Sequence, residues 1–161
     1  MHRTYGSLKS RPLCYNPEKN MDRIRISRIA YAVIAWGIVV ALLIQVSLIG
    51  LWLFSGQPTL AIHKEFGHAI FLGVFGLLIL AYIGRLAPRM KFATALLSVV
   101  TAVQTEVFAL LPGSPLRAFH TVLPLVIFAL AAFLARGATS FLPVRLGQVA
   151  LPLPIGESRA N

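Results

Sequence analysis

The sequence predicts an all-α integral membrane protein, a bundle of four transmembrane helices in up-down-up-down order that is made of two similar helical hairpins. Three observations predict it: an apolar composition, four long apolar runs, and an internal repeat. Of the 161 residues, 57% are hydrophobic and only 12% are charged, and the mean hydropathy is +0.77. Such a chain is too apolar for a domain whose surface faces water, which excludes a soluble enzyme.

The four apolar runs cover residues 29–54, 60–84, 92–111 and 118–135. Each approaches the ~20 residues with which a helix crosses ~30 Å of hydrocarbon. We expect helices, because a helix satisfies its own backbone polar groups in lipid and no run alternates as a barrel strand would. The first run is too long for the apolar region of a signal peptide, so we expect a retained anchor. The connections are short, as between neighbouring helices of a bundle.

The chain is expected to divide into a basic arm over residues 1–28, the bundle over 29–136, and a proline-containing tail over 137–161, with the start of the arm disordered. The arm has seven Lys and Arg residues, and the second connection and the tail have three each. The first and third connections have one each, Lys64 and Arg117. The positive-inside rule therefore places both termini in the cytoplasm, and we expect a bacterial inner membrane. Basic residues beside a span favour this topological role over nucleic-acid binding.

The internal repeat is the pattern Pro, two residues, Ala, one apolar residue, His, which ends once at His63 and once at His120. Gln45 lies 18 residues before the first histidine and Gln104 lies 16 before the second. Each half is a hairpin that enters from the same side, so an axis along the membrane normal should relate the two. We therefore expect the two histidines to face each other at equal depth.

Two imidazoles from opposite helices at matched depth suit bis-histidine ligation of a haem iron, with His63 and its repeat partner as ligands. Gly67, one turn further along, is expected to let a porphyrin lie close to the backbone. Lys64 and Arg117 at the outer rim are expected to meet haem propionates. His68 is five residues after His63, about 140° around the helix, so it is an alternative ligand, a ligand of a second site or a hydrogen-bonding residue.

Other polar residues allow plainer interpretations, since histidines in membrane bundles also serve as interhelical contacts. We expect Gln45 and Gln104 to hydrogen-bond to each other across the first and third helices. Glu106 is expected to pair with Arg117, and the alternatives are that it orients a histidine or accepts a proton from a quinol. The single cysteine, Cys14, excludes an internal disulfide, an iron–sulfur cluster and a cysteine-based zinc site built by this chain alone.

Two stretches of the chain carry a resemblance to a known family. Residues 63–67 read His-Lys-Glu-Phe-Gly, and residues 104–135 place a glutamine before a short Gly/Pro turn and a histidine that leads into an apolar helix. Over about residues 29–136 the chain resembles one four-helix half of haem A synthase, and also small four-span bacterial membrane proteins with this histidine layout. Residues 65–68 align alternatively with a Glu, two residues, His pattern of the family, which leaves the second-helix ligand open.

The resemblance implies haem b binding more than any particular reaction, because the chain has half the length of the synthase and lacks its extracytoplasmic cysteine pair. We expect a membrane-embedded haem b protein in electron transfer with a quinone or a partner redox subunit, rather than an enzyme. One alternative is a haem-free accessory subunit of a respiratory or photosynthetic complex. Another is an enzyme of the haem A synthase type that acts as a dimer of halves.

Overall fold

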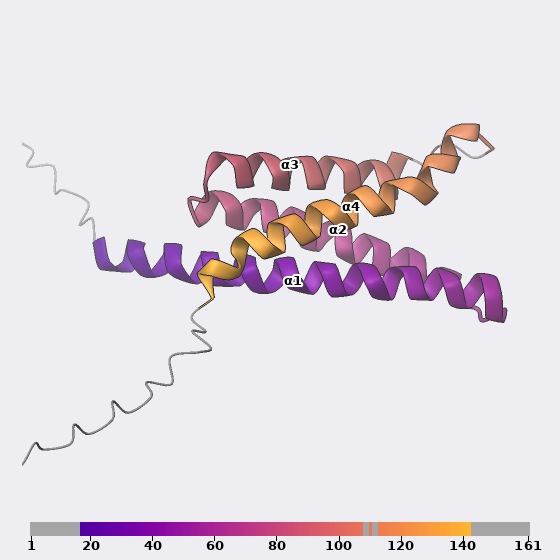
Figure 1. Ribbon diagram of the computed structural model, residues 1–161, viewed down its shortest axis with the longest axis horizontal. Helices are drawn as coiled ribbons and strands as arrows, with labels where there is room; N and C mark the ends of the chain where they lie inside the picture. Colours follow the sequence, from indigo (N-terminus) through magenta and orange to yellow (C-terminus); the bar gives the residue numbers. More distant parts are fainter. Residues whose placement is uncertain (1–16, 108–109, 111–112, 143–161) are drawn as a thin grey trace, which may run out of the picture.

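The computed structural model of the protein describes residues 17–107, 110 and 113–142, and Figure 1 shows their arrangement. Within these residues the chain is helical apart from short connections and has no strand, which confirms the all-α prediction. The α-helices are α1 (Pro17–Ser55), α2 (Leu60–Ile83), α3 (Pro88–Ala102) and α4 (Phe119–Ala138). A π-helical segment, η1 (Val103–Val107), continues α3, and two 3₁₀ turns, η3 (Pro115–Ala118) and η4 (Thr139–Phe141), flank α4.

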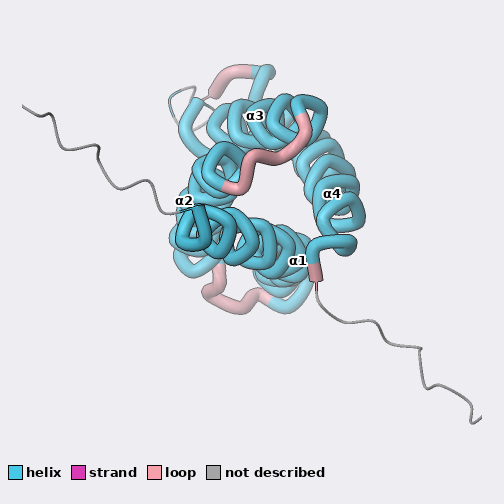
Figure 2. The backbone as a smooth tube through the Cα atoms, turned by 90° about the vertical axis from the view of Figure 1, so that its left-hand side faces the viewer, coloured by secondary structure: helices cyan, strands magenta, loops and turns pink. Residues whose placement is uncertain are grey.

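The four helices form a ring, as the view along the bundle shows (Figure 2). Each helix packs against its neighbours in the chain, and α1 also packs against α4. Arg28 near the start of α1 donates to the carbonyl of Gly84 after the end of α2, whereas Gln45 near the end of α1 reaches His63 at the start of α2. The chain therefore reverses between α1 and α2. In this ring α2 and α4 occupy diagonal positions, each between α1 and α3.

Three stretches are long and apolar enough to cross a membrane: Glu18–Ser55, Leu60–Ile83 and Phe119–Phe141. They indicate a membrane protein. The third helix differs from its prediction, because α3 begins at Pro88 and has 15 α-helical residues, a length of about 22 Å. The backbone then widens into η1.

Helix α1 begins at Pro17, so residues 17–28 of the expected arm are helical. Glu18 in the first turn suits the positive end of the helix dipole, and no glycine or proline interrupts the chain before Gly37. The first residues of the expected tail are helical too, because α4 and η4 continue to Phe141. The predictions for residues 1–16 and for the tail from 143 onward lie outside the described residues.

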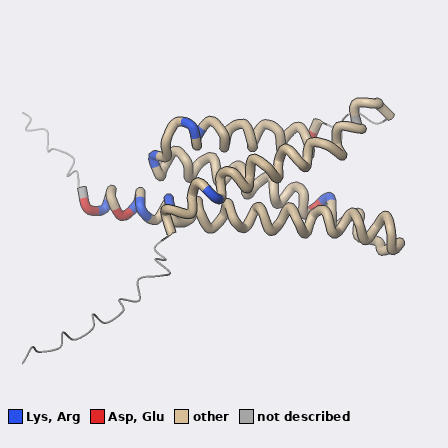
Figure 3. Tube along the Cα trace, in the orientation of Figure 1, with Lys and Arg blue, Asp and Glu red and all other residues tan. Residues whose placement is uncertain are grey.

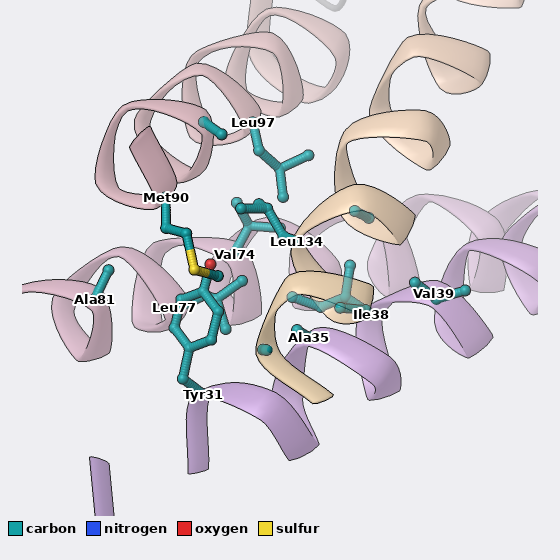
Figure 4. Packing of buried hydrophobic residues seen from close by; sticks show 14 of the residues in the cluster. Tyr31, Ala35, Ile38, Val39, Val74, Leu77, Ala81, Met90, Leu97 and Leu134 are labelled. Atoms are coloured by element: carbon teal, nitrogen blue, oxygen red, sulfur yellow. The ribbon is translucent and has the colours of Figure 1, made fainter. Parts of the chain in front are cut away.

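The buried side chains lie in one half of the bundle, and Figure 4 shows how some of them pack. In α1 they recur at Tyr31, Ala35, Ile38 and Leu42, a spacing of four, three and four residues that places them on one helix face. Helices α2, α3 and α4 add residues of the same kind, among them Ile70, Val74, Leu77, Ala81, Leu97, Ala131, Leu134 and Ala135. The many alanines let the helix backbones approach closely, which favours packing in lipid.

The same half of the bundle holds most of the charge and two polar contacts between helices. Figure 3 shows most Lys and Arg residues at the end where α1 begins. The Arg28 Nε donates to the Gly84 carbonyl at 2.9 Å, which satisfies a terminal carbonyl of α2. The Tyr31 hydroxyl lies 2.7 Å from the Thr94 hydroxyl, which itself donates to the carbonyl of Met90. Tyr31 is therefore the donor and ties α1 to α3.

The other half, which contains both repeat histidines, has no fully buried side chain among the described residues. Buried positions stop after Leu42 in α1 and after Thr101 in α3, and they begin only at Ile70 in α2 and Ile127 in α4. We call this part of the bundle the open half. It lies at the end of the bundle opposite the basic cluster.

Candidate site: a duplicated glutamine–histidine contact

The first hairpin brings Gln45 of α1 against His63 in the first turn of α2. The amide nitrogen of Gln45 donates to the backbone carbonyl of His63 at 2.7 Å. A carbonyl oxygen only accepts hydrogen bonds, so the orientation of the amide is determined, with Nε2 on His63 and Oε1 turned away. The imidazole Nδ1 of His63 in turn lies 3.2 Å from the backbone carbonyl of Gln45. Both side chains are half-buried.

The second hairpin repeats this contact. The amide nitrogen of Gln104, in η1, donates to the backbone carbonyl of His120 at 2.9 Å. The internal repeat seen in the sequence therefore corresponds to a repeated interaction in the structure. The predicted hydrogen bond between Gln45 and Gln104 is wrong, because neither side-chain oxygen accepts a hydrogen bond within the described residues, and each amide nitrogen donates to the histidine carbonyl of its own hairpin.

The residue four positions after each histidine explains how its carbonyl is left open to the glutamine. In an α-helix a carbonyl accepts from the N–H four residues later, and the side chain there lies close by. At this position α4 has Pro124, which has no N–H, so the His120 carbonyl lacks that partner and takes Gln104 instead. In α2 the equivalent residue is Gly67, where an added Cβ would lie 3.1 Å from the Gln45 Nε2. Pro124 lacks the N–H donor and Gly67 lacks a side chain, and each thereby leaves the histidine carbonyl accessible to the glutamine.

Gly67 has a role in the contact between α1 and α2, and its predicted contact with a porphyrin stays a prediction. The Gln45 amide nitrogen would lie 3.1 Å from a Cβ added to this residue. Because Gly67 has no side chain, α1 can approach α2 closely at this position.

The backbone contact of His63 selects one tautomer of its ring. Nδ1 must carry a proton to share with the Gln45 carbonyl, so in the neutral imidazole Nε2 has the lone pair. Metal-bound histidines are commonly held in this way, with one ring nitrogen donating to a carbonyl while the other binds the metal. The Gln45 Nε2 lies 3.5 Å from this nitrogen, at the outer limit of a hydrogen bond.

The remaining predicted site residues lie around the start of α2 and α4. His120 is exposed in the first turn of α4, and Lys64 is exposed beside His63. Arg117 belongs to η3, and its side chain lies outside the described residues. The two histidines come from the diagonal helices α2 and α4, as ligation across a bundle requires. That their rings face each other stays a prediction.

His68 and Glu106 form a second polar contact in the open half. The imidazole Nε2 of His68 lies 3.5 Å from the Glu106 carboxylate, and the two side chains are 53% and 50% exposed. Glu106 thus lies beside a histidine, as one of the alternatives has it, and its predicted pairing with Arg117 involves a side chain outside the described residues. The π-helical η1 segment contacts both α2 and α4 and presents Glu106 to the first and Gln104 to the second.

Both glutamines keep one polar atom without a hydrogen bond. The Oε1 atoms of Gln45 and Gln104 are buried and have no partner within the described part of the chain. Buried amide oxygens normally accept at least one hydrogen bond, from protein, water or ligand. Within the same residues no three His, Cys, Asp or Glu side chains come together as a group that would bind a metal.

Fold and site together define a helical protein with membrane-length helices and a duplicated glutamine–histidine contact. No family model matches the chain, and comparison with curated proteins and with solved structures yielded no match. The resemblance to haem A synthase therefore stays a prediction that rests on the motifs.

Proposed function

We propose that the chain crosses a bacterial inner membrane four times, in up-down-up-down order, with both termini in the cytoplasm. The 15 residues of α3 and the 5 of η1 together match the ~20 that a span needs. The distribution of charge supports the orientation. Apart from Lys64 and Arg117, every described Lys and Arg lies near the start of α1, around the α2–α3 connection or in the last turn of α4. This asymmetry is the one that the positive-inside rule describes.

We further propose that the protein binds haem b in the open half and takes part in electron transfer with a quinone or a partner redox subunit. The repeated glutamine–histidine contact is the observation that supports this most directly. In this proposal His63 and His120 hold the iron, and Lys64 and Arg117 meet the propionates. When bound, haem supplies a one-electron carrier whose potential depends on its ligands and its burial.

The residues that are present fit such a group by the chemistry of their donors. The Nδ1 of His63 is engaged by the Gln45 carbonyl, so its Nε2, which lies 3.5 Å from the Gln45 amide nitrogen, is the atom that would bind the iron, and the second imidazole comes from the diagonal helix. The two glutamine amides attach the backbone of each histidine to the preceding helix, so the spacing of the two imidazoles is set by both hairpins.

The decisive experiment is a reduced-minus-oxidised absorption spectrum of the purified full chain, together with haem extraction. We expect a b-type spectrum. The single substitutions His63→Ala and His120→Ala should each lower the bound haem about tenfold or more, because each removes an axial ligand. Ile62→Ala and Phe119→Ala are matched controls, since these neighbours are 57% and 56% exposed and should leave the spectrum unchanged.

Three other results would change the proposal. A flat spectrum without extractable haem would reject haem binding and favour the haem-free accessory subunit. A loss of haem in His68→Ala but not in His63→Ala would move the second-helix ligand to His68. The appearance of haem A that depends on this chain would favour an enzyme of the haem A synthase type.

A further inference from the structure

The contact between His68 and Glu106 is separate from the two glutamine–histidine hydrogen bonds. It joins α2 to η1 in the open half, and both side chains are about half exposed. The neighbouring side chains are apolar and exposed: Leu72, one turn after His68, is 66% exposed, and Val107 next to Glu106 is 43% exposed. An acid and an imidazole are therefore set in an apolar surface.

The depth of this contact makes such a surface costly. His68 is eight residues after Leu60, the first residue of α2, which is about 12 Å along a helix of about 36 Å. At this depth a span faces the hydrocarbon and not the headgroups. An exposed carboxylate and imidazole are unfavourable there, and ionisable residues within spans are usually paired or covered by a polar group of functional importance.

We propose that His68 and Glu106 form a binding site for the head group of a lipid-soluble quinone or hydroquinone. A carboxylate oxygen of Glu106 accepts a hydrogen bond from a hydroquinone hydroxyl, and an imidazole N–H of His68 donates to a quinone oxygen. The exposed apolar side chains Leu72 and Val107 contact the ring and the start of the tail. The inference rests on the membrane location in the proposed function, and it assigns a site to the quinone named there.

Depth distinguishes this ligand from the other polar molecules of a bilayer. A phospholipid headgroup stays at the membrane surface, whereas a quinone has a small, weakly polar head group that moves within the hydrocarbon. Water alone would hydrogen-bond to the polar atoms, but the adjacent apolar side chains of Leu72 and Val107 would then contact that water as well. A ring with two opposite oxygens satisfies both requirements, because its faces are apolar and its edges form hydrogen bonds.

The test is equilibrium binding of decylubiquinone to the full chain in phospholipid nanodiscs, with an azido-quinone photolabel to locate the site by mass spectrometry. We expect saturable binding and labelling of α2 and η1 that decylubiquinone displaces. Glu106→Gln should weaken binding of the reduced form about tenfold, since it removes a charge-assisted hydrogen bond. Glu65→Gln is the matched control, because this exposed acid lies on the same helix three residues before His68.

Helix content and thermal unfolding show whether each variant is folded, and His68→Ala provides a second change at the same site. Equal affinity in Glu106→Gln, Glu65→Gln and the original protein would overturn the proposal. So would binding no greater than to empty nanodiscs, or labelling confined to other helices. Binding is measured without reference to any haem spectrum, so a chain that binds quinone but no haem refutes only the haem proposal, and the reverse result refutes only this one.

Discussion

The close approach of Gln45 to the backbone of α2 gives a sharp prediction for Gly67→Ala. In an ordinary helix interior, replacing glycine by alanine stabilises by about 0.8–1.0 kcal/mol. At this position the new Cβ would lie 3.1 Å from the Gln45 Nε2 and displace it from the His63 carbonyl. Loss of that hydrogen bond costs about 0.5–1.5 kcal/mol. The two effects nearly cancel, so the net change in the free energy of unfolding should be close to zero.

Gly73→Ala is the matched control for this substitution. Gly73 is in the same helix, and a Cβ there would have no neighbour within 4 Å. It should therefore show the full gain, about 1 kcal/mol more stable than Gly67→Ala. The free energies of unfolding are compared by denaturant titration of the two variants in the same detergent micelles.

A second measurement examines the imidazole itself. Histidine ¹⁵N NMR of the protein without added haem should show His63 as the Nδ1–H tautomer, and Gly67→Ala should shift it towards a mixture of tautomers. Gly73→Ala should leave the tautomer unchanged. A Gly67→Ala variant that is as stabilising as Gly73→Ala and leaves the His63 resonances in place would refute the displacement of Gln45 by the new Cβ.

Two further predictions concern other hydrogen bonds. Gln104→Ala should destabilise the protein by about 1 kcal/mol, because it removes the hydrogen bond to the His120 carbonyl. In the Pro124→Ala background the loss should be smaller, because residue 124 then supplies an N–H for that carbonyl. Equal losses in the two backgrounds of this double-mutant cycle would contradict the role given to Pro124. Arg28→Ala should lower the free energy of unfolding by about 1–2 kcal/mol, because it removes the donor to the carbonyls of Gly84 and Arg85 that directly follow α2. Replacement of the exposed Arg25 by Ala should change it by less than about 0.5 kcal/mol. Denaturant titration distinguishes the two variants, and equal effects would refute the capping role.

The helical class and most helix positions could be predicted from the sequence, because apolar runs of this length have few other solutions in lipid. The exact residues at which the helices begin and end were harder to predict from the sequence. Helix α1 begins at Pro17, inside the expected arm, since charged residues such as Arg23 and Arg25 are also good helix formers. The π-helical widening after Ala102 had no clear signal either, because the hydropathy of residues 103–107 does not reveal their hydrogen-bond register.

The candidate site divides in a similar way. The sequence repeat marked Gln45, His63, Gln104 and His120 as related positions, and the structure shows that each glutamine bonds to the histidine of its own hairpin. The signal for this was present in the residue four positions after each histidine. The sequence did not reveal what these two residues have in common, because glycine and proline are chemically unlike. They act alike here only because each leaves the carbonyl of the preceding histidine accessible.

By itself, then, the sequence determined that this protein is helical, that its charges gather near one end, and that its two halves carry the same polar residues. The tertiary structure alone decided which atoms meet: Gln45 with the His63 carbonyl, and His68 with Glu106. The physical reason is the sequence separation over which each effect acts. Hydropathy and helix propensity act between residues a few positions apart, whereas a hydrogen bond between helices depends on the rotation and close approach of segments far apart in the chain, to within a fraction of an ångström.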